Sequence, residues 1–118
     1  MAKRMNFNSF KDYQCFARDT AIYPNQGKLG GLTYSSLGLV GEAGEIANKV
    51  KKILRDDYGV IQSTKIDEIG DEIGDVLWYL ANICEDLGIE LAEVAEVNLN
   101  KLYDRKERGV LKGSGDKR

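Results

Sequence analysis

Apolar residues recur at intervals of three and four along most of this chain, which is the spacing of helices that bury one face. The spacing predicts four helices, over residues 9–20, 33–55, 64–87 and 90–107. Ser9 with Asp12 and Thr64 with Asp67 resemble capping boxes, and Gly88 ends the third helix. No segment is convincing as a strand. We therefore expect an all-α fold, an antiparallel four-helix bundle in which the second and third helices are adjacent.

The second and third predicted helices are apolar around much of their circumference and carry one polar stripe each. On the third helix the apolar residues are Ile66, Ile69, Ile73, Val76, Leu77, Leu80, Ile83 and Leu87, and the stripe is Glu68, Glu72, Asp75, Tyr79, Asn82 and Asp86. On the second helix the apolar residues are Leu37, Val40, Ile46, Ala47, Val50, Ile53 and Leu54, and the stripe includes Glu42, Glu45, Lys49 and Lys52. On the fourth helix the residues expected to face inward are Leu91, Val94, Ala95 and Leu102. Charged residues are rarely buried unless they are paired, so polar stripes on such apolar helices are candidate sites.

Glycines interrupt both of these helices, at Gly38, Gly41 and Gly44 in the second and at Gly70 and Gly74 in the third. Each glycine in a helix interior costs roughly 1 kcal/mol relative to alanine. We expect them to mark a tight crossing of the two helices, because glycine lets two backbones approach closely. The alternative is that some of them mark helix ends.

Two pairs of carboxylates lie at i, i+3 spacing within the stripes, Glu42 with Glu45 and Glu72 with Asp75. Residues three apart share a helix face, about 4.5 Å apart along the axis. Four carboxylates on two crossing helices can supply the oxygen ligands of a hard divalent cation such as Mg²⁺, with Mn²⁺ as a substitute. The alternative is a solvated acidic face, which is the commoner setting for one such pair taken alone.

The inward line of the fourth helix turns polar and basic toward its end, at Asn98, Lys101 and Arg105. One explanation is that these side chains reach anionic oxygens near the metal, such as phosphates. The other is that cations simply suit the C-terminal end of a helix dipole. Carboxylate-bound Mg²⁺ beside lysine and arginine favours phosphate chemistry.

Composition narrows the function further. The chain has 118 residues, 42% of them hydrophobic, which suits a single domain, expected over residues 1–108, with a flexible glycine-rich tail over 109–118. A net charge of −2 argues against a general binder of nucleic acid or of anionic membranes. The absence of histidine excludes histidine-ligated zinc and histidine general bases.

Cysteine usage and hydropathy give no sign of export. Cys15 and Cys84 form no redox or metal pair, and both are expected to be buried as small hydrophobes. There is no signal peptide, and no apolar run approaches the length of a membrane span, so a cytoplasmic location is expected.

The order and spacing of these motifs resemble those of the MazG-like all-α nucleotide pyrophosphohydrolases. The resemblance rests on residues 37–46 with Glu42 and Glu45, on residues 72–80 with Glu72 and Asp75, and on Asn82, Asn98, Lys101 and Leu102. It covers most of the chain from about Tyr13. Gly41 stands where many relatives carry a second glutamate, and Glu68 is a candidate to complete the ligand set.

The resemblance implies Mg²⁺-dependent hydrolysis of a ribo- or deoxyribonucleoside triphosphate to the monophosphate and pyrophosphate, a nucleotide-pool house-cleaning activity, in a homodimer or homotetramer. It implies the metal ligands Glu42, Glu45, Glu72 and Asp75, with Glu45 or Glu42 also activating the attacking water. The candidate substrate-binding residues are Asn82, Asn98, Lys101, Arg105, Lys49 and, for the base, Tyr79. Tyr79 is preferred over Tyr13, Phe16 and Trp78 because it lies on the carboxylate stripe.

Two other classes of function stay open at this stage. One is a metal-stabilised helical module that binds a nucleotide or a partner without turnover. The other is a structural or interaction protein whose acidic stripes are merely solvated. Pyrophosphate release would exclude the first, and stabilisation by Mg²⁺ or Mn²⁺ would exclude the second.

Overall fold

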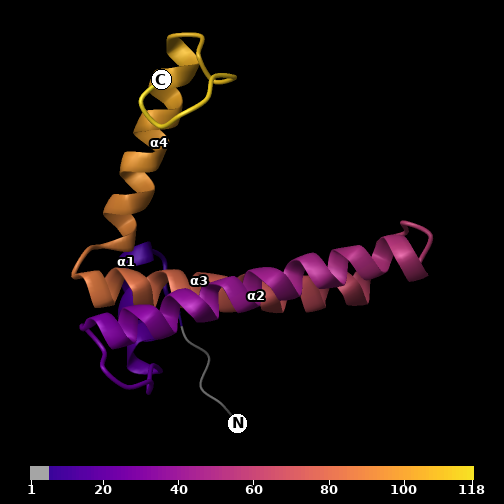
Figure 1. The fold of residues 1–118 in the computed structure, drawn as a ribbon, viewed down its shortest axis with the longest axis horizontal. Coiled ribbons are helices and arrows are strands. Elements are labelled where there is room, and N and C mark those ends of the chain that lie inside the picture. The colour runs from indigo at the N-terminus through magenta and orange to yellow at the C-terminus, as the bar shows by residue number, and fades with distance from the viewer. Residues whose placement is uncertain (1–5) are drawn as a thin grey trace.

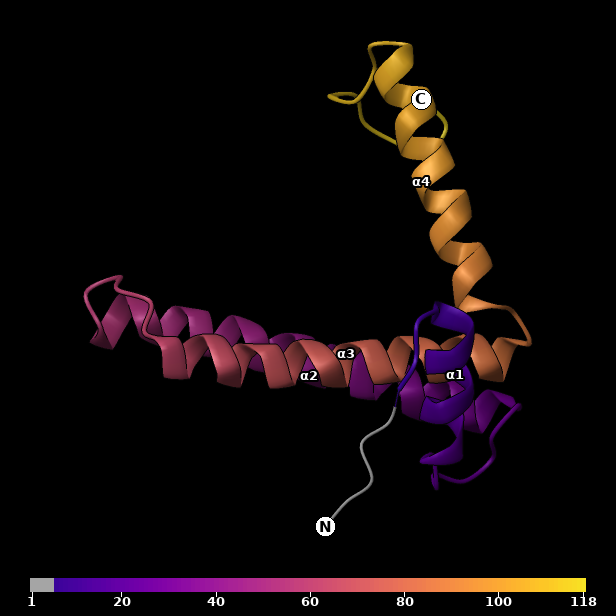
Figure 2. The same cartoon turned by 180° about the vertical axis from the view of Figure 1, so that it is seen from behind.

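The computed structural model describes residues 6–118, and within that range it contains four helices and no strand. The helices are α1 (Phe10–Asp19), α2 (Leu29–Asp56), α3 (Ser63–Leu87) and α4 (Leu91–Glu107). α2 and α3 form a long antiparallel hairpin, α1 lies across one end of it, and α4 leaves that same end and projects away from the pair (Figures 1 and 2). The prediction of an all-α fold with adjacent second and third helices is confirmed.

The helix boundaries follow the sequence signals in part. The Asp12 amide donates to Ser9 Oγ over 3.1 Å, which confirms Ser9 as the cap of α1. Gly88 ends α3 in the left-handed conformation, with φ of 69°. The Thr64–Asp67 box is wrong, because α3 starts one residue earlier, at Ser63, without a side-chain cap.

α2 begins at Leu29, four residues before the predicted start. Gly30 and Gly31 resemble loop residues in the sequence, but here they let the first turn of the helix pack against the preceding chain. The Gly31 amide donates to the Asn25 carbonyl over 3.0 Å, and a Cβ at Gly31 would lie 2.9 Å from Gln26 Cα. Tertiary packing therefore overrides the low helix propensity of this pair.

The core lies where α1, α3 and the start of α4 meet. Ala17, Ala81, Cys84 and Leu91 are buried there, and Tyr13, Leu77 and Trp78 pack against them. Cys84 is buried as predicted, whereas the same prediction for Cys15 is wrong, since its α1 face is exposed. On α4 the predicted inward line holds for Leu91 but not for Val94, which is 44% exposed, because the helix projects beyond the core.

Most of the apolar surface of the α2–α3 hairpin is open in the single chain. The exposed side chains on these two helices include Leu37, Val40, Val50, Leu54, Ile66, Ile73 and Leu80. The other helices of the chain therefore leave part of the apolar set of α3 uncovered.

The glycines behave in two ways. A Cβ at Gly38 would overlap the ring of Tyr79, so this glycine does mark a tight approach of α2 to α3. The same prediction is wrong for the other four glycines of the two helices. Among residues 6–118, nothing lies within 4 Å of an added Cβ at Gly41, Gly44, Gly70 or Gly74.

The last ten residues fold back beside α4 (Figure 1). The guanidinium of Arg118 donates to the carbonyls of Val110, Leu111 and Gly115 over 3.1, 3.2 and 2.6 Å. The flexibility of this tail stays a prediction. None of the helices in the described part of the chain combines the length and the apolar character needed to cross a membrane.

Candidate functional site

Three of the predicted carboxylates meet on the facing sides of α2 and α3. Glu42 of α2 and Glu72 and Asp75 of α3 each offer an oxygen, and these oxygens lie within 4.8 Å of one another. The i, i+3 spacing places Glu72 and Asp75 on one face of α3, and the antiparallel packing of the hairpin brings Glu42 opposite them. We refer to Glu42, Glu72 and Asp75 as the carboxylate group.

The electrostatics of the carboxylate group are those of crowded like charges. A hydrogen bond shared with Glu72 raises the pKa of Glu42, and partial burial and the nearby charges of Asp75 and Glu45 raise it further. Lys49 Nζ lies 4.0 Å from Glu72 Oε1 and supplies one positive charge. The group therefore holds a proton more tightly than separate carboxylates would.

The donor set fits a hard divalent cation. Three carboxylates within reach of one point provide oxygen ligands, and neither sulfur nor nitrogen ligands stand among them. The raised pKa of Glu42 indicates that positive charge is favoured at this place, and without a cation a proton supplies that charge. A cation would relieve the same repulsion.

The fourth predicted ligand, Glu45, lies outside this group. It is exposed on α2, close enough for its charge to act on Glu42. Glu68 is also exposed and pairs with Lys65 over 3.2 Å, so it does not complete the group in the single chain. Glu45 is thus placed beside the carboxylate group rather than within it.

Tyrosines border the carboxylate group. Burial raises the pKa of Tyr79, and the neighbouring Tyr34 and the charge of Glu42 add to the effect. Burial likewise raises the pKa of Tyr13, and Asp75 contributes. Both tyrosines stay neutral at physiological pH and present phenol groups near the carboxylates.

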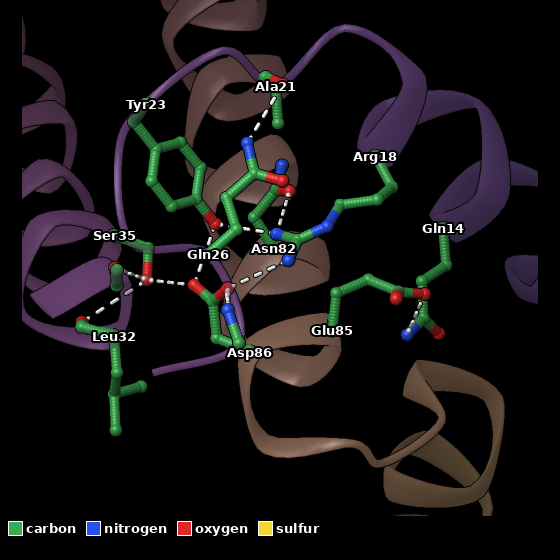
Figure 3. Close-up of polar contacts among 12 residues, drawn as sticks. Gln14, Arg18, Ala21, Tyr23, Gln26, Leu32, Ser35, Asn82, Glu85 and Asp86 are labelled. Carbon is green, nitrogen blue, oxygen red and sulfur yellow. Dashed lines mark hydrogen bonds and ion pairs between the residues drawn. The ribbon is translucent and has the colours of Figure 1, made fainter. Parts of the chain in front are cut away.

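A second polar cluster lies further along the same stripe of α3, and Figure 3 shows it. The buried Asp86 carboxylate accepts hydrogen bonds from Tyr23 Oη (2.6 Å), the Gly27 amide (2.9 Å), Arg18 Nη2 (3.0 Å) and Ser35 Oγ (3.1 Å). Burial alone would raise the pKa of Asp86, but these four donors outweigh it and hold the pKa below its usual range. We call Asp86 with its four donors the buried lock.

Asn82, a predicted substrate contact, belongs to this second cluster. It is fully buried, its Oδ1 accepts from Arg18 over 3.1 Å, and its Nδ2 donates to the Trp78 carbonyl over 3.1 Å. Its polar atoms are therefore used inside the chain, where they orient Arg18.

The predicted phosphate contacts on α4 lie apart from the carboxylate group in the single chain. α4 packs on α1 and α3, and it makes no contact with α2 along the described residues. Arg105 is only 4% exposed and donates to the Asp116 carbonyl over 2.6 Å, while Lys101 Nζ lies 3.9 Å from Asp116 Oδ1. Asn98 is exposed and lines a groove of about 390 Å³ on α4.

Comparison with known proteins decides the family. Residues 33–110 match the model of the MazG nucleotide pyrophosphohydrolase domain. The chain belongs to this family. It is also 56% identical over 109 residues to the Gene 37 protein of Mycobacterium phage L5, an alignment that covers 90% of this chain and 96% of that protein. No solved structure gives a significant match.

The MazG match and the structure divide the chain differently. The match includes the carboxylate group, but it starts after α1 and after the α1–α2 loop. Arg18, Tyr23 and Gly27 precede it, yet they hold Asp86, which lies within it. The buried lock thus joins the N-terminal segment to the MazG domain.

Sequence reasoning placed Asp86 on the polar stripe but missed its donors. Arg18 and Tyr23 lie 68 and 63 residues away along the chain, and no local pattern links them to Asp86. The available signal was an acidic residue flanked by Leu87 and Ile83 on an apolar helix, which indicates a buried charge in need of a partner.

Proposed function

We propose that this MazG-family protein hydrolyses a nucleoside triphosphate to the monophosphate and pyrophosphate with Mg²⁺, or with Mn²⁺ as a substitute. The observation that carries the proposal is the carboxylate group, in which Glu42, Glu72 and Asp75 meet within the matched domain. Such an activity removes nucleotides from the cellular pool, which is the house-cleaning role expected from the sequence.

Each side chain has a part in this proposal. Glu42, Glu72 and Asp75 hold the metal, which would neutralise the triphosphate and acidify a water. Glu45, exposed beside the group, orients the attacking water and takes its proton. A new bond then forms between the water oxygen and the α-phosphorus, and the bond from that phosphorus to the bridging oxygen breaks. Pyrophosphate leaves, and Lys49, whose Nζ lies 4.0 Å from Glu72 Oε1, would help to neutralise the charge of the pyrophosphate.

We also propose that the working unit contains a second copy of the chain, as a homodimer or homotetramer. The open apolar side chains and the uncovered glycines of the α2–α3 hairpin form a surface that a helix of another copy can approach closely. Closed two-fold symmetry is the commonest arrangement for such a contact. A neighbouring α4 would bring Asn98, Lys101 and Arg105 toward the phosphates, which the chain's own α4 does not do.

The test is a panel of ribo- and deoxyribonucleoside triphosphates with Mg²⁺, in which both products are measured. We expect equimolar monophosphate and pyrophosphate from at least one substrate. The variant Asp75→Asn, which removes one charge of the carboxylate group, is tested on the same panel. Its matched control is Asp71→Asn, because Asp71 is an exposed aspartate of the same helix outside the carboxylate group. Binding of the nucleotide without pyrophosphate release would instead support a module without turnover.

A further inference from the structure

An exposed tyrosine lies on a buried one at the start of α2. Tyr34 and Tyr23 are stacked, with ring centroids 4.8 Å apart and planes 10° from parallel. Tyr23 is only 6% exposed, whereas Tyr34 is 47% exposed. Because Tyr23 covers one face of the Tyr34 ring and the side chain is still half open, the other face of that ring is available to a flat ligand.

The ring beneath Tyr34 is firmly held. Tyr23 Oη donates to Asp86 and accepts from Arg18 Nη1 over 2.8 Å, and Trp78 packs edge-on against its ring at 6.3 Å between centroids. Burial and the Asp86 hydrogen bond raise the pKa of Tyr23 to about 12. The buried lock therefore fixes the orientation of the stack before any ligand arrives, which lowers the entropy lost on binding.

The stack is joined to the carboxylate group through Tyr79. Burial raises the pKa of Tyr79, and both a hydrogen bond with Tyr34 and the charge of Glu42 add to the effect, so its phenol lies near both residues. Gly38 leaves room for the Tyr79 ring against α2. Tyr34 precedes Glu42 by eight residues, about 12 Å along the helix axis. That separation is comparable with the span from the base to the phosphates of an extended nucleotide.

We propose that Tyr34 is the platform on which the nucleobase of the substrate stacks, with the triphosphate directed along α2 toward the carboxylate group. This inference rests on the proposed function for the identity of the ligand. The sequence pattern favoured Tyr79 for this part, but the ring of Tyr79 is wedged against Gly38, so Tyr34 is the ring with a free face. A platform of this kind recognises the flat face shared by every base, and the larger purines gain more contact than pyrimidines.

Binding is tested without turnover. The probe is an ATP analogue with a methylene between its α and β phosphates, titrated with Mg²⁺ into the wild type, Tyr34→Leu and Tyr34→Phe, beside ribose 5-triphosphate, which lacks the base. We expect Tyr34→Leu to weaken the analogue roughly 10-fold or more, and Tyr34→Phe to bind it about as the wild type does. Ribose 5-triphosphate should bind all three proteins alike. Tyr58→Leu, an exposed tyrosine in the turn between α2 and α3, is the control and should change neither ligand.

The outcomes separate this proposal from the proposed function. If the wild type releases pyrophosphate but Tyr34→Leu binds the analogue normally, the platform is refuted and the activity stands. If the wild type binds the analogue through Tyr34 but releases no pyrophosphate from any natural nucleoside triphosphate, the platform stands and the activity is refuted. An equal loss for ribose 5-triphosphate would also refute the platform, since a general distortion would explain it. Should Tyr34→Leu fail to fold, Tyr34→Trp decides: binding at least as tight as wild type is expected, and weaker binding overturns the proposal.

Discussion

The polar stripe of α3 contains two acidic centres with opposite electrostatics. At Asp86 four donors converge on a buried carboxylate and its pKa falls. At the carboxylate group three acidic side chains from two helices lie close together, and the pKa of Glu42 rises. Acidic residues of the hairpin are thus satisfied by hydrogen-bond donors at one end and frustrated by crowded like charges further along it. The satisfied centre stabilises the fold, and the frustrated one is suited to bind a cation.

The largest expected effect is the loss of turnover when the carboxylate group or its neighbour Glu45 is changed. Glu45→Gln and Asp75→Asn should each lower turnover by about two orders of magnitude or more, as expected for loss of a general base or of a metal ligand. Without metal, the stability of Asp75→Asn should stay level or rise, because one of the crowded charges is gone. Turnover is measured by pyrophosphate release and stability by urea unfolding with a chelator. Near-normal turnover in either variant would remove that residue from the site.

Removing the charge of Asp86 from the buried lock should instead lower the free energy of unfolding. Asp86→Asn leaves Arg18 without its ionic partner, and losing one partner of a buried pair costs about 3 kcal/mol. Urea unfolding should show that loss with or without Mg²⁺, whereas Asp71→Asn on the same helix should be neutral. An Asp86→Asn variant as stable as the wild type would mean that the lock does not stabilise the fold.

The sequence predicted the parts of this comparison that depend on local spacing. The helices and the facing positions of Glu42, Glu72 and Asp75 follow from the 3.6-residue period and the antiparallel turn. The donors of Asp86 could not be predicted, because Arg18 is brought to it only by the crossing of α1 over the hairpin.

Two further features lay beyond the sequence for different reasons. The direction of α4 depends on the short link after Gly88, and a helix with apolar residues on several sides has no single face that fixes its partner. The stacking of Tyr34 on Tyr23 joins a loop to a helix, so helical periodicity says nothing about it. Both features depend on tertiary contacts rather than on the local pattern.

A second copy that supplies cations to the carboxylate group would reduce the difference between the two centres. Lys101→Ala should then raise KM about 10-fold, as for a lost charged hydrogen bond. Mixing Glu45→Gln with Lys101→Ala should restore activity at low substrate to about a quarter of wild type, because half of the two-fold assemblies are mixed and one of their two sites is intact.

A mixture without complementation would mean that α4 does not act on the site of a neighbouring subunit. If the mixture only averages the two single variants, Lys101 and Glu45 act in the same subunit or Lys101 does not act at all. A variant of Lys106, a neighbouring exposed lysine of α4, serves as the control and should neither change KM nor complement.

The smallest effect concerns pH, and here the two centres should differ in sign. The folded-state pKa of Asp86 is below its ordinary 3.8, so its contribution to stability is complete above that value and is lost as the pH falls through the folded pKa. The folded-state pKa of Glu42 is above its ordinary 4.5, so its contribution is complete below that value and is lost as the pH rises through the folded pKa. In metal-free protein, thermal melts from pH 4 upward should therefore show a decline in stability that Glu42→Gln removes and that Asp86→Asn leaves in place. Saturating Mg²⁺ should cancel the decline as well, because the cation takes the place of the proton. A decline that persists in Glu42→Gln would assign it to other groups and would remove the evidence for a frustrated centre.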